Sequence, residues 1–214
     1  MGSLGRYNMK PNEKYGQLAN EEAIQRTVKA LRSNNFKVEI VENSEEAKNK
    51  VLQLLPQGAE VFTMTSQTLE AIGVDKEINE SGKYNATRPK LFAMDRNTQA
   101  REMAKIGAAP DWVVASVHAA TEDGHLLIAS NSGSQLSSEV YAGGRVIFVV
   151  GTQKIVTDTQ EGIKRIYEYP LPLEDERARK AYGMPSSVNK ILIINKEVMP
   201  GRITVILVKE KLGF

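Results

Sequence analysis

One stretch of the chain decides the fold: DWVVASVHAATEDGHLLIASNSGSQL at residues 111–136. An apolar run at 112–117 and a second at 126–129 each predict a strand, and the short polar link between them favours a hairpin. Asp123 followed by Gly124 marks a turn within that link. The stretch is more polar than a hairpin that only fills a core needs to be, because hydroxyl, amide and charged side chains flank the second run on both sides.

Helical and strand patterns alternate around this stretch. Apolar residues recur at helical spacing after Asn20 and after Ser44, and short apolar runs follow these segments. Helices are predicted at 20–34, 44–55, 97–106 and 157–167, and further strands at 36–41, 60–64, 145–150, 191–194 and 203–209. Such alternation is typical of a mostly parallel sheet covered by helices. We therefore predict a three-layer α/β fold, with a mostly parallel central sheet and an antiparallel hairpin extension from residues 111–130.

Length and composition fit one globular domain behind a polar arm. The chain has 214 residues, of which 25% are charged and 41% are hydrophobic. Residues 1–19 are polar and contain Gly and Pro, which predicts a flexible N-terminal arm ahead of one α/β domain at 20–214. The proline-containing segment 170–185 is predicted as an exposed flap that could serve as a homodimer surface.

Charge and hydropathy argue against several classes of partner. The net charge is +2, which is too small to favour nucleic acid or an anionic membrane surface. No apolar run approaches the length that spans a bilayer, and the N-terminus lacks the apolar core of a signal peptide. We therefore expect a cytoplasmic protein without membrane insertion.

The cysteine count narrows the chemistry of the chain. The sequence has no cysteine and two histidines, His118 and His125, and it contains no HExxH motif. Disulfides, thiolate nucleophiles, cysteine-ligated zinc and cysteine-ligated iron–sulfur clusters are thereby excluded from this chain. We predict no metal site and no cofactor.

Four polar segments leave the ends of predicted strands, namely TSQTL (65–69), HAATEDGH (118–125), SNSGSQL (130–136) and GTQKIV (151–156). In open α/β sheets, ligands bind outside the carboxyl ends of the strands, where hydroxyls, amides and free N–H groups can hold an anion. The predicted ligand-binding residues are Ser66, Thr68, Asn131, Ser132, Gly133 and Lys154. Structural alternatives stay open: Ser66 could be only a helix cap, Gly133 only part of a turn, and Lys154 a solvated lysine.

Glu122 is the predicted catalytic residue. At a strand end among apolar neighbours, its carboxyl could serve proton transfer or nucleophilic attack. The alternative is a solvated turn carboxylate. Asp123 and His125 are secondary candidates, although Asp before Gly is commonly a turn residue and a single histidine beside a strand is commonly structural.

Four segments, taken in order, make the chain resemble a known family. They are TLEAIG (68–73), DWVVASVHAATEDGHLLIASNSGSQL (111–136), GGRVIFVVGTQKIV (143–156) and PGRITVILV (200–208). This ordered set resembles the LUD domain of lactate-utilisation proteins, over nearly the whole chain from residue 20 onward. The segments LPLE (171–174) and VNK (188–190) look like those of the single-domain branch of that family.

The resemblance implies both a fold and a setting. LUD proteins look like members of the fold shared by ribose-5-phosphate isomerase and the CoA transferases, whose members bind phosphate or carboxylate groups at strand ends. The implied setting is oxidation of L-lactate to pyruvate in a complex with iron–sulfur proteins. This chain departs from the family pattern at Asp123 and His125, where hydroxyl side chains are common, and at Ala71, where an acidic residue is frequent. The ligand is therefore left open.

Three hypotheses for function follow. The leading one is a non-redox component that supports oxidation of L-lactate to pyruvate with iron–sulfur partners. The second is a stand-alone enzyme that binds a phosphorylated or carboxylated small molecule at the strand-end loops, with Glu122 as general acid–base or nucleophile. The third is a non-catalytic binding or scaffold module. Whether the chain is an enzyme stays open among them.

Overall fold

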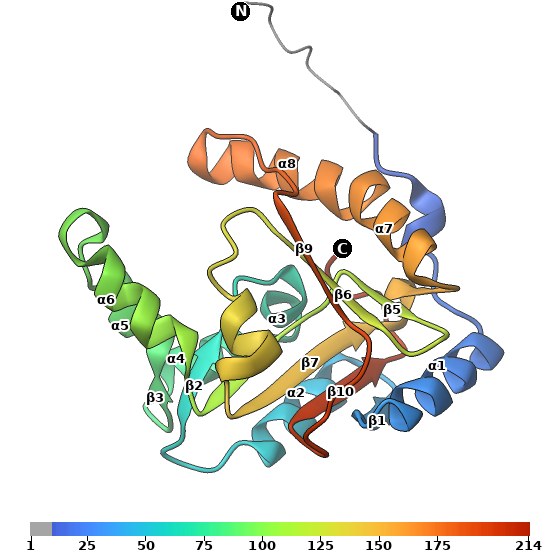
Figure 1. The fold of residues 1–214 in the computed structure, drawn as a ribbon, viewed down its shortest axis with the longest axis horizontal. Helices are drawn as coiled ribbons and strands as arrows, with labels where there is room; N and C mark the ends of the chain where they lie inside the picture. The colour runs from blue at the N-terminus through green and yellow to red at the C-terminus, as the bar shows by residue number, and fades with distance from the viewer. Residues whose placement is uncertain (1–9) are drawn as a thin grey trace, which may run out of the picture.

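Six parallel strands form the central sheet of the computed structural model, which describes residues 10–214 (Figure 1). In spatial order they are β1 (Lys37–Val41), β10 (Ile203–Val208), β7 (Arg145–Gly151), β4 (Trp112–Ala115), β2 (Glu60–Thr63) and β3 (Asn85–Ala86). Every neighbouring pair in this sheet is parallel. The central strands β10, β7 and β4 are buried on both faces, which explains why their sequences are continuous apolar runs. The predicted parallel sheet is confirmed.

A second, four-stranded sheet contains the predicted antiparallel extension. Its order is β8 (Ile155–Val156), β5 (Ala119–Thr121), β6 (Leu126–Ser130) and β9 (Lys190–Ile194). β6 is antiparallel to β5 and to β9, whereas β8 is parallel to β5. The hairpin is therefore formed by β5 and β6, and not by residues 112–117 as predicted. Because β4 is apolar on both faces, it takes a central place in the parallel sheet, and the chain changes sheet at residues 116–118.

The hairpin turn requires glycine at position 124. Gly124 has a φ of +89°, and a Cβ there would lie 2.7 Å from the backbone carbonyl carbon of Ala30 in helix α1 (Glu21–Ser33). The side-chain amide of Asn34 donates to the carbonyl oxygens of Asp123 and Gly124, at 3.3 and 3.0 Å. The turn is therefore seated on the C-terminal end of α1.

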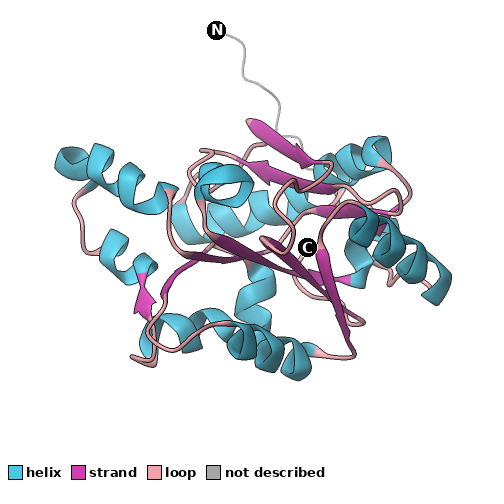
Figure 2. Ribbon diagram, turned by 60° about the horizontal axis from the view of Figure 1, so that its bottom comes forward, coloured by secondary structure: helices cyan, strands magenta, loops and turns pink. Residues whose placement is uncertain are grey.

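Helices cover both faces of the central sheet (Figure 2). One face packs against α2 (Ser44–Leu54), α3 (Gln67–Ile72) and α4 (Val74–Glu80). The opposite face packs against α1 and the inner side of the second sheet. The outer side of the second sheet packs against α7 (Thr159–Glu168). The three-layer α/β fold is thereby confirmed, with the second sheet and α7 added on one side.

The remaining helical segments lie at the edges of these layers. Helices α5 (Thr87–Phe92) and α6 (Arg96–Ala108) flank the β2–β3 edge, and α8 (Pro170–Tyr182) follows α7 (Figure 1). Short helical turns are η1 (Glu13–Gly16), η2 (Ser138–Ala142, of the π type) and η3 (Thr152–Lys154). Within residues 10–214, no helix is both long enough and apolar enough to cross a membrane.

The predicted flexible arm at residues 1–19 extends into the packed structure. Its first nine residues, 1–9, lie outside the described residues. Within 10–19, Tyr15 is buried, and its hydroxyl donates to Glu161 of α7 at 3.0 Å. Lys14 pairs with the same carboxylate at 2.6 Å. Burial of its aromatic ring packs Tyr15 against α7, which polar composition alone did not indicate.

Candidate ligand-binding site

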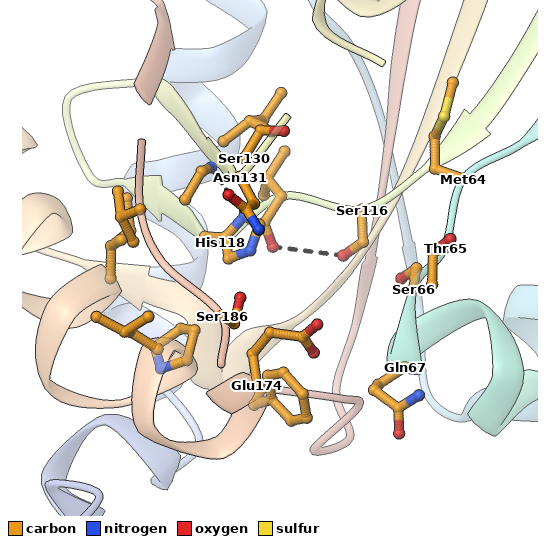
Figure 3. Close-up of a pocket in the computed structure, with 18 of the residues that line it drawn as sticks. Met64, Thr65, Ser66, Gln67, Ser116, His118, Ser130, Asn131, Glu174 and Ser186 are labelled. Carbon is orange, nitrogen blue, oxygen red and sulfur yellow. Dashed lines mark hydrogen bonds between the residues drawn. The ribbon is translucent and has the colours of Figure 1, made fainter. Parts of the chain in front are cut away.

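A cavity of about 210 Å³ lies at the carboxyl ends of β2 and β4 (Figure 3). Its walls are residues 64–68 after β2, 116–118 after β4, 128–131 at the end of β6, Lys154 after β7, and α8 with the segment 186–188. Figure 3 shows side chains from opposite walls, such as Ser116 and Glu174, facing one space. Segments far apart in the sequence therefore meet where open α/β sheets bind ligands.

The size of the cavity indicates how large a group it can enclose. A cavity of roughly 150 Å³ holds benzene, and pockets for drug-sized ligands run from roughly 300 Å³ upward. A volume of about 210 Å³ therefore suits a metabolite of about ten non-hydrogen atoms or fewer. A larger ligand would extend out of the cavity through its open side.

Lys154 brings a buried amine to the cavity. It ends the turn η3 directly after β7, and its side chain is 2% exposed. Its Nζ donates to Thr68 Oγ1 at 2.9 Å, to Ser116 Oγ at 3.0 Å and to the Val117 carbonyl oxygen at 3.1 Å. These acceptors match the three N–H donors of an ammonium group. No Asp or Glu among residues 10–214 pairs with Lys154, so the amine has no anionic partner in the described chain.

Two opposing effects act on the charge of Lys154. Burial, and then the nearby charge of Arg165, lower the pKa of the amine well below its usual range. The three oxygen acceptors stabilise the ammonium and oppose this fall. An anion in the cavity would raise the pKa again, because an opposite charge favours the ammonium. The charge of this lysine is thus coupled to occupancy of the cavity by an anion.

Arg165 and His118 lie next to Lys154. Arg165 of α7 is fully buried and donates to the carbonyl oxygen of His118 and, at 3.3 Å, to that of Tyr15. Burial lowers the pKa of Arg165 to about 10, so its guanidinium is charged at neutral pH. His118 Nδ1 accepts from the Ala129 N–H at 3.1 Å, which places the proton of the neutral ring on Nε2. Burial, followed by the charges of Lys154 and Arg165, lowers the pKa of His118 to about 3.

Glu139 is the buried acid of the cavity wall. It lies in the π-helical turn η2 and is 1% exposed. Burial raises its pKa well above the usual range, so the neutral carboxyl is favoured and does not offset the charge of the neighbouring Arg165. The charge of Arg165, together with an ammonium on Lys154 once an anion is bound, suits an anionic ligand in this part of the cavity. Among residues 10–214, no three His, Asp or Glu side chains are grouped as metal ligands would be.

Helix α8 and the segment after it form the outer wall. Arg177 and Glu174 on α8 form a two-bond ion pair, with both distances at 2.7 Å. The side-chain oxygen of Asn131 accepts from Asn189 at 2.6 Å and from Ser187 at 3.3 Å. A few polar contacts thus tie the outer wall to the end of β6.

Four of the predicted ligand-binding residues lie in the cavity wall. Lys154 and Thr68 are buried and hydrogen-bonded to each other. Ser66 lines the cavity and also caps α3, where its hydroxyl accepts from the Leu69 N–H at 3.4 Å. Asn131 lines the cavity while its amide holds the outer wall. Ligand binding by these residues stays a prediction that their position favours.

Glu122, the predicted catalytic residue, does not lie in the cavity wall. Its carboxylate pairs with Arg26 of α1, with Nε and Oε2 2.5 Å apart. The direction of the hairpin explains this position. β6 runs from the turn to Ser130 at the cavity, and at about 3.3 Å per residue the turn is roughly 13 Å away. A catalytic role for Glu122 stays a prediction, without support from its position.

The other four predicted site residues also lie outside the cavity wall. Asp123 accepts a hydrogen bond within the hairpin turn, and His125 Nδ1 lies 2.9 Å from the hydroxyl of Thr159 on α7. Gly133 takes a φ of +83° in a turn next to the exposed Ser132. These contacts match the structural alternatives that the sequence left open.

His118, Ser116 and Glu139 belong to the cavity wall and were not among the predicted site residues. The sequence could have indicated His118 as a site residue, because it begins the polar segment 118–125 directly after a predicted strand. Glu139 stands in SSEVYAGG, where nothing in the residue spacing indicates a π-helical turn.

A parallel sheet covered by helices, with a polar cavity at the carboxyl ends of its strands, defines an open α/β domain of the kind that binds ligands there. The family model of the LUD domain matches residues 24–208. The chain therefore belongs to the LUD domain family, as its ordered sequence segments predicted.

A solved structure shares this fold. The crystal structure of a DUF162 family protein from Deinococcus radiodurans matches with a TM-score of 0.54 and 14% sequence identity. The match covers 90% of this chain and 99% of that chain. At this identity the likeness concerns the fold alone. Among proteins of curated function, none matches this chain.

Proposed function

We propose that this LUD domain protein is a non-redox component of the oxidation of L-lactate to pyruvate, in which it binds a small carboxylate and works with iron–sulfur partners. The observation that carries the proposal is the buried Lys154, whose amine lines the cavity without an anionic partner among residues 10–214. Lactate and pyruvate are well within the size that about 210 Å³ admits.

The wall residues suggest how the acid would be held. The Lys154 ammonium would release its bond to the Val117 carbonyl oxygen, keep those to Ser116 and Thr68, and give the third donor to the incoming carboxylate in a charge-assisted hydrogen bond. The neutral His118 ring carries its proton on Nε2 and offers a further donor from the same wall. The outer wall of α8 would shield these contacts from water and so strengthen them.

A titration tests the binding step. We expect L-lactate and pyruvate to bind. Lactamide has the same shape as lactate without its charge, and its affinity is expected to be lower by roughly tenfold or more, a difference of about 1.4 kcal/mol in binding free energy. Isothermal titration calorimetry of the purified protein measures this difference. Equal affinity for the acid and its amide, or no binding of either acid, would contradict the proposal.

A capture experiment tests the partners. The 214 residues contain no cysteine, so cysteine ligation of a cluster falls to another chain. We expect the tagged protein, isolated without oxygen from lactate-grown cells of its own source, to retain chains that carry iron and acid-labile sulfide. The protein from cells grown without lactate is the control. Isolation of the protein alone under both conditions would count against an iron–sulfur partner.

A second candidate function is a stand-alone enzyme acting on a carboxylated or phosphorylated small molecule. It is favoured because Lys154, His118 and Glu139, whose pKa values are all shifted, line one cavity. After the titration, NMR of the recovered ligand separates the two functions. A chemically changed acid would favour the enzyme, and an unchanged acid would favour the binding component.

A further inference from the structure

Glu139 lines the cavity, and one of its carboxyl oxygens is buried without a hydrogen-bond partner in the described part of the chain. The residue is 1% exposed, and none of residues 10–214 hydrogen-bonds with its Oε2. No cation of the described chain compensates it either, since burial alone accounts for the rise of its pKa. A buried polar atom without a partner costs free energy, so its position at the cavity calls for a physical explanation.

Hydrogen bonds from Arg202 hold the main chain around Glu139 in place, so the Glu139 side chain starts from a fixed backbone. The Arg202 guanidinium donates to the carbonyl oxygens of Glu139 at 3.1 Å, Val140 at 2.9 Å and Gly143 at 3.1 Å. Its charge is paired with Glu197 at 2.8 Å. Arg202 therefore fixes the main chain of η2 while leaving the Glu139 carboxyl itself without a cation.

A neutral carboxyl can both donate through its hydroxyl and accept through its carbonyl oxygen. A hydroxyl or carbonyl group of a ligand would form a hydrogen bond with such a carboxyl. A carboxylate group of the ligand would instead bind more favourably to Lys154. The lining of one cavity thus contains an amine that becomes cationic beside an anion and a neutral hydrogen-bonding group. These two groups complement an acid that carries a second, uncharged oxygen function.

We propose that Glu139 is a specificity-determining residue, whose carboxyl hydrogen-bonds a hydroxyl or carbonyl oxygen of an acid ligand held by Lys154. This role rests on the proposed function, because it presumes that the cavity takes a small acid. It adds that the cavity selects hydroxy and oxo acids over acids that lack the second oxygen. The apolar analogue leaves the Glu139 carboxyl buried and unpaired, which is a strong basis for discrimination.

Matched pairs of acids test this role. L-Lactate is compared with propionate, and 3-hydroxybutyrate with butyrate, by calorimetric titration of the wild type, Glu139→Gln and Glu139→Met. In the wild type we expect the oxygenated member of at least one pair to bind roughly tenfold more tightly than its partner. Glu139→Gln keeps a donor and an acceptor at the same place and is expected to retain most of the preference. Glu139→Met is expected to lose it, with the affinity for the deoxy acid within about twofold of the wild type.

Glu122→Met is the matched control, because Glu122 lies outside the cavity wall and pairs with Arg26. It is expected to keep the preference of the wild type. If Glu139→Met keeps the preference for the oxygenated acid, or if Glu122→Met loses it instead, the role of Glu139 is overturned. The proposal that the cavity binds a small acid is unaffected by either result. Failure of every acid to bind the wild type would overturn the proposed function and this role with it. Thermal unfolding checks that each variant is folded, and the ratio of two affinities within one variant is independent of the folded fraction.

Discussion

Replacing Lys154 with methionine is expected to weaken the binding of L-lactate or pyruvate by about a hundredfold or more, which corresponds to about 2.7 kcal/mol. Methionine fills a similar volume but removes the charge that the described chain leaves without an anionic partner. Lys164→Met on α7 is the control, since Lys164 is exposed and pairs with Glu161 at 3.4 Å. Calorimetric titration of both variants, after their folding is checked by circular dichroism, gives the comparison. Wild-type affinity in Lys154→Met would remove the basis of the proposed function.

The pH dependence of the wild type tests the same lysine without a mutation. Burial and Arg165 lower the pKa of the free amine, and a bound carboxylate raises it, so binding above the ligand-free pKa takes up a proton. Affinity is therefore expected to fall by up to about tenfold per pH unit above that pKa and to level off below it. Titration in buffers of different ionisation enthalpy measures the proton uptake. Constant affinity up to the ordinary lysine pKa of about 10.4 would mean that Lys154 stays charged without a ligand.

The position of Lys154 could be predicted from the sequence because it follows from topology. A lysine shortly after a central parallel strand must lie near the carboxyl edge of the sheet, and so must Ser66 and Thr68 after β2. The apolar residues at 146–150 and 61–62 before them indicated the two strands, and the end of each strand lies at this edge. The cavity wall does contain all three side chains.

The position of Glu122 could not be predicted in the same way. The polar segment 118–125 reads as one cluster, but the three residues of β5 run through its middle. His118 lies at the cavity end of this strand and Glu122 at the turn end, where α1 supplies Arg26 as a partner. A three-residue strand of two alanines and a threonine is too short to stand out within a polar segment, so the sequence alone did not separate its two ends.

The position of Glu139 depends on tertiary contacts that have no local sequence signal. Its π-helical turn is held by Arg202, which is distant in the sequence. Gly143 closes the turn at a point where a Cβ would overlap the Ser138 carbonyl oxygen. The pair of glycines at 143–144 directly precedes β7, and it gives no sign of which neighbouring side chain is buried.

His118 is expected to make the protein sensitive to acid. Its pKa is about 3 in the folded chain, against an ordinary value of 6.5 for the unfolded chain. Above the ordinary value both states hold a neutral ring, and the histidine adds no pH dependence. As the pH falls below it, the unfolded chain takes up a proton that the folded chain does not, so the free energy of unfolding decreases. The shift alone would give about 5 kcal/mol, and because the ring is only partly shielded from water in the cavity wall, we expect on the order of 3 kcal/mol.

His118→Asn isolates this effect, because the asparagine side-chain oxygen can still accept from the Ala129 N–H that now donates to Nδ1. Urea unfolding at several pH values between about 7.5 and 4.5, around the ordinary histidine pKa, is expected to show a shallower loss of stability in His118→Asn than in the wild type. Glu161, whose pKa is lowered to about 2 by its bonds to Lys14 and Tyr15, also loses stabilising contacts in acid. That loss is common to both proteins and cancels in their difference. Equal slopes in the wild type and His118→Asn would mean that His118 accepts its proton in the folded chain as readily as in the unfolded one, and that burial in the cavity wall does not disfavour the charged ring.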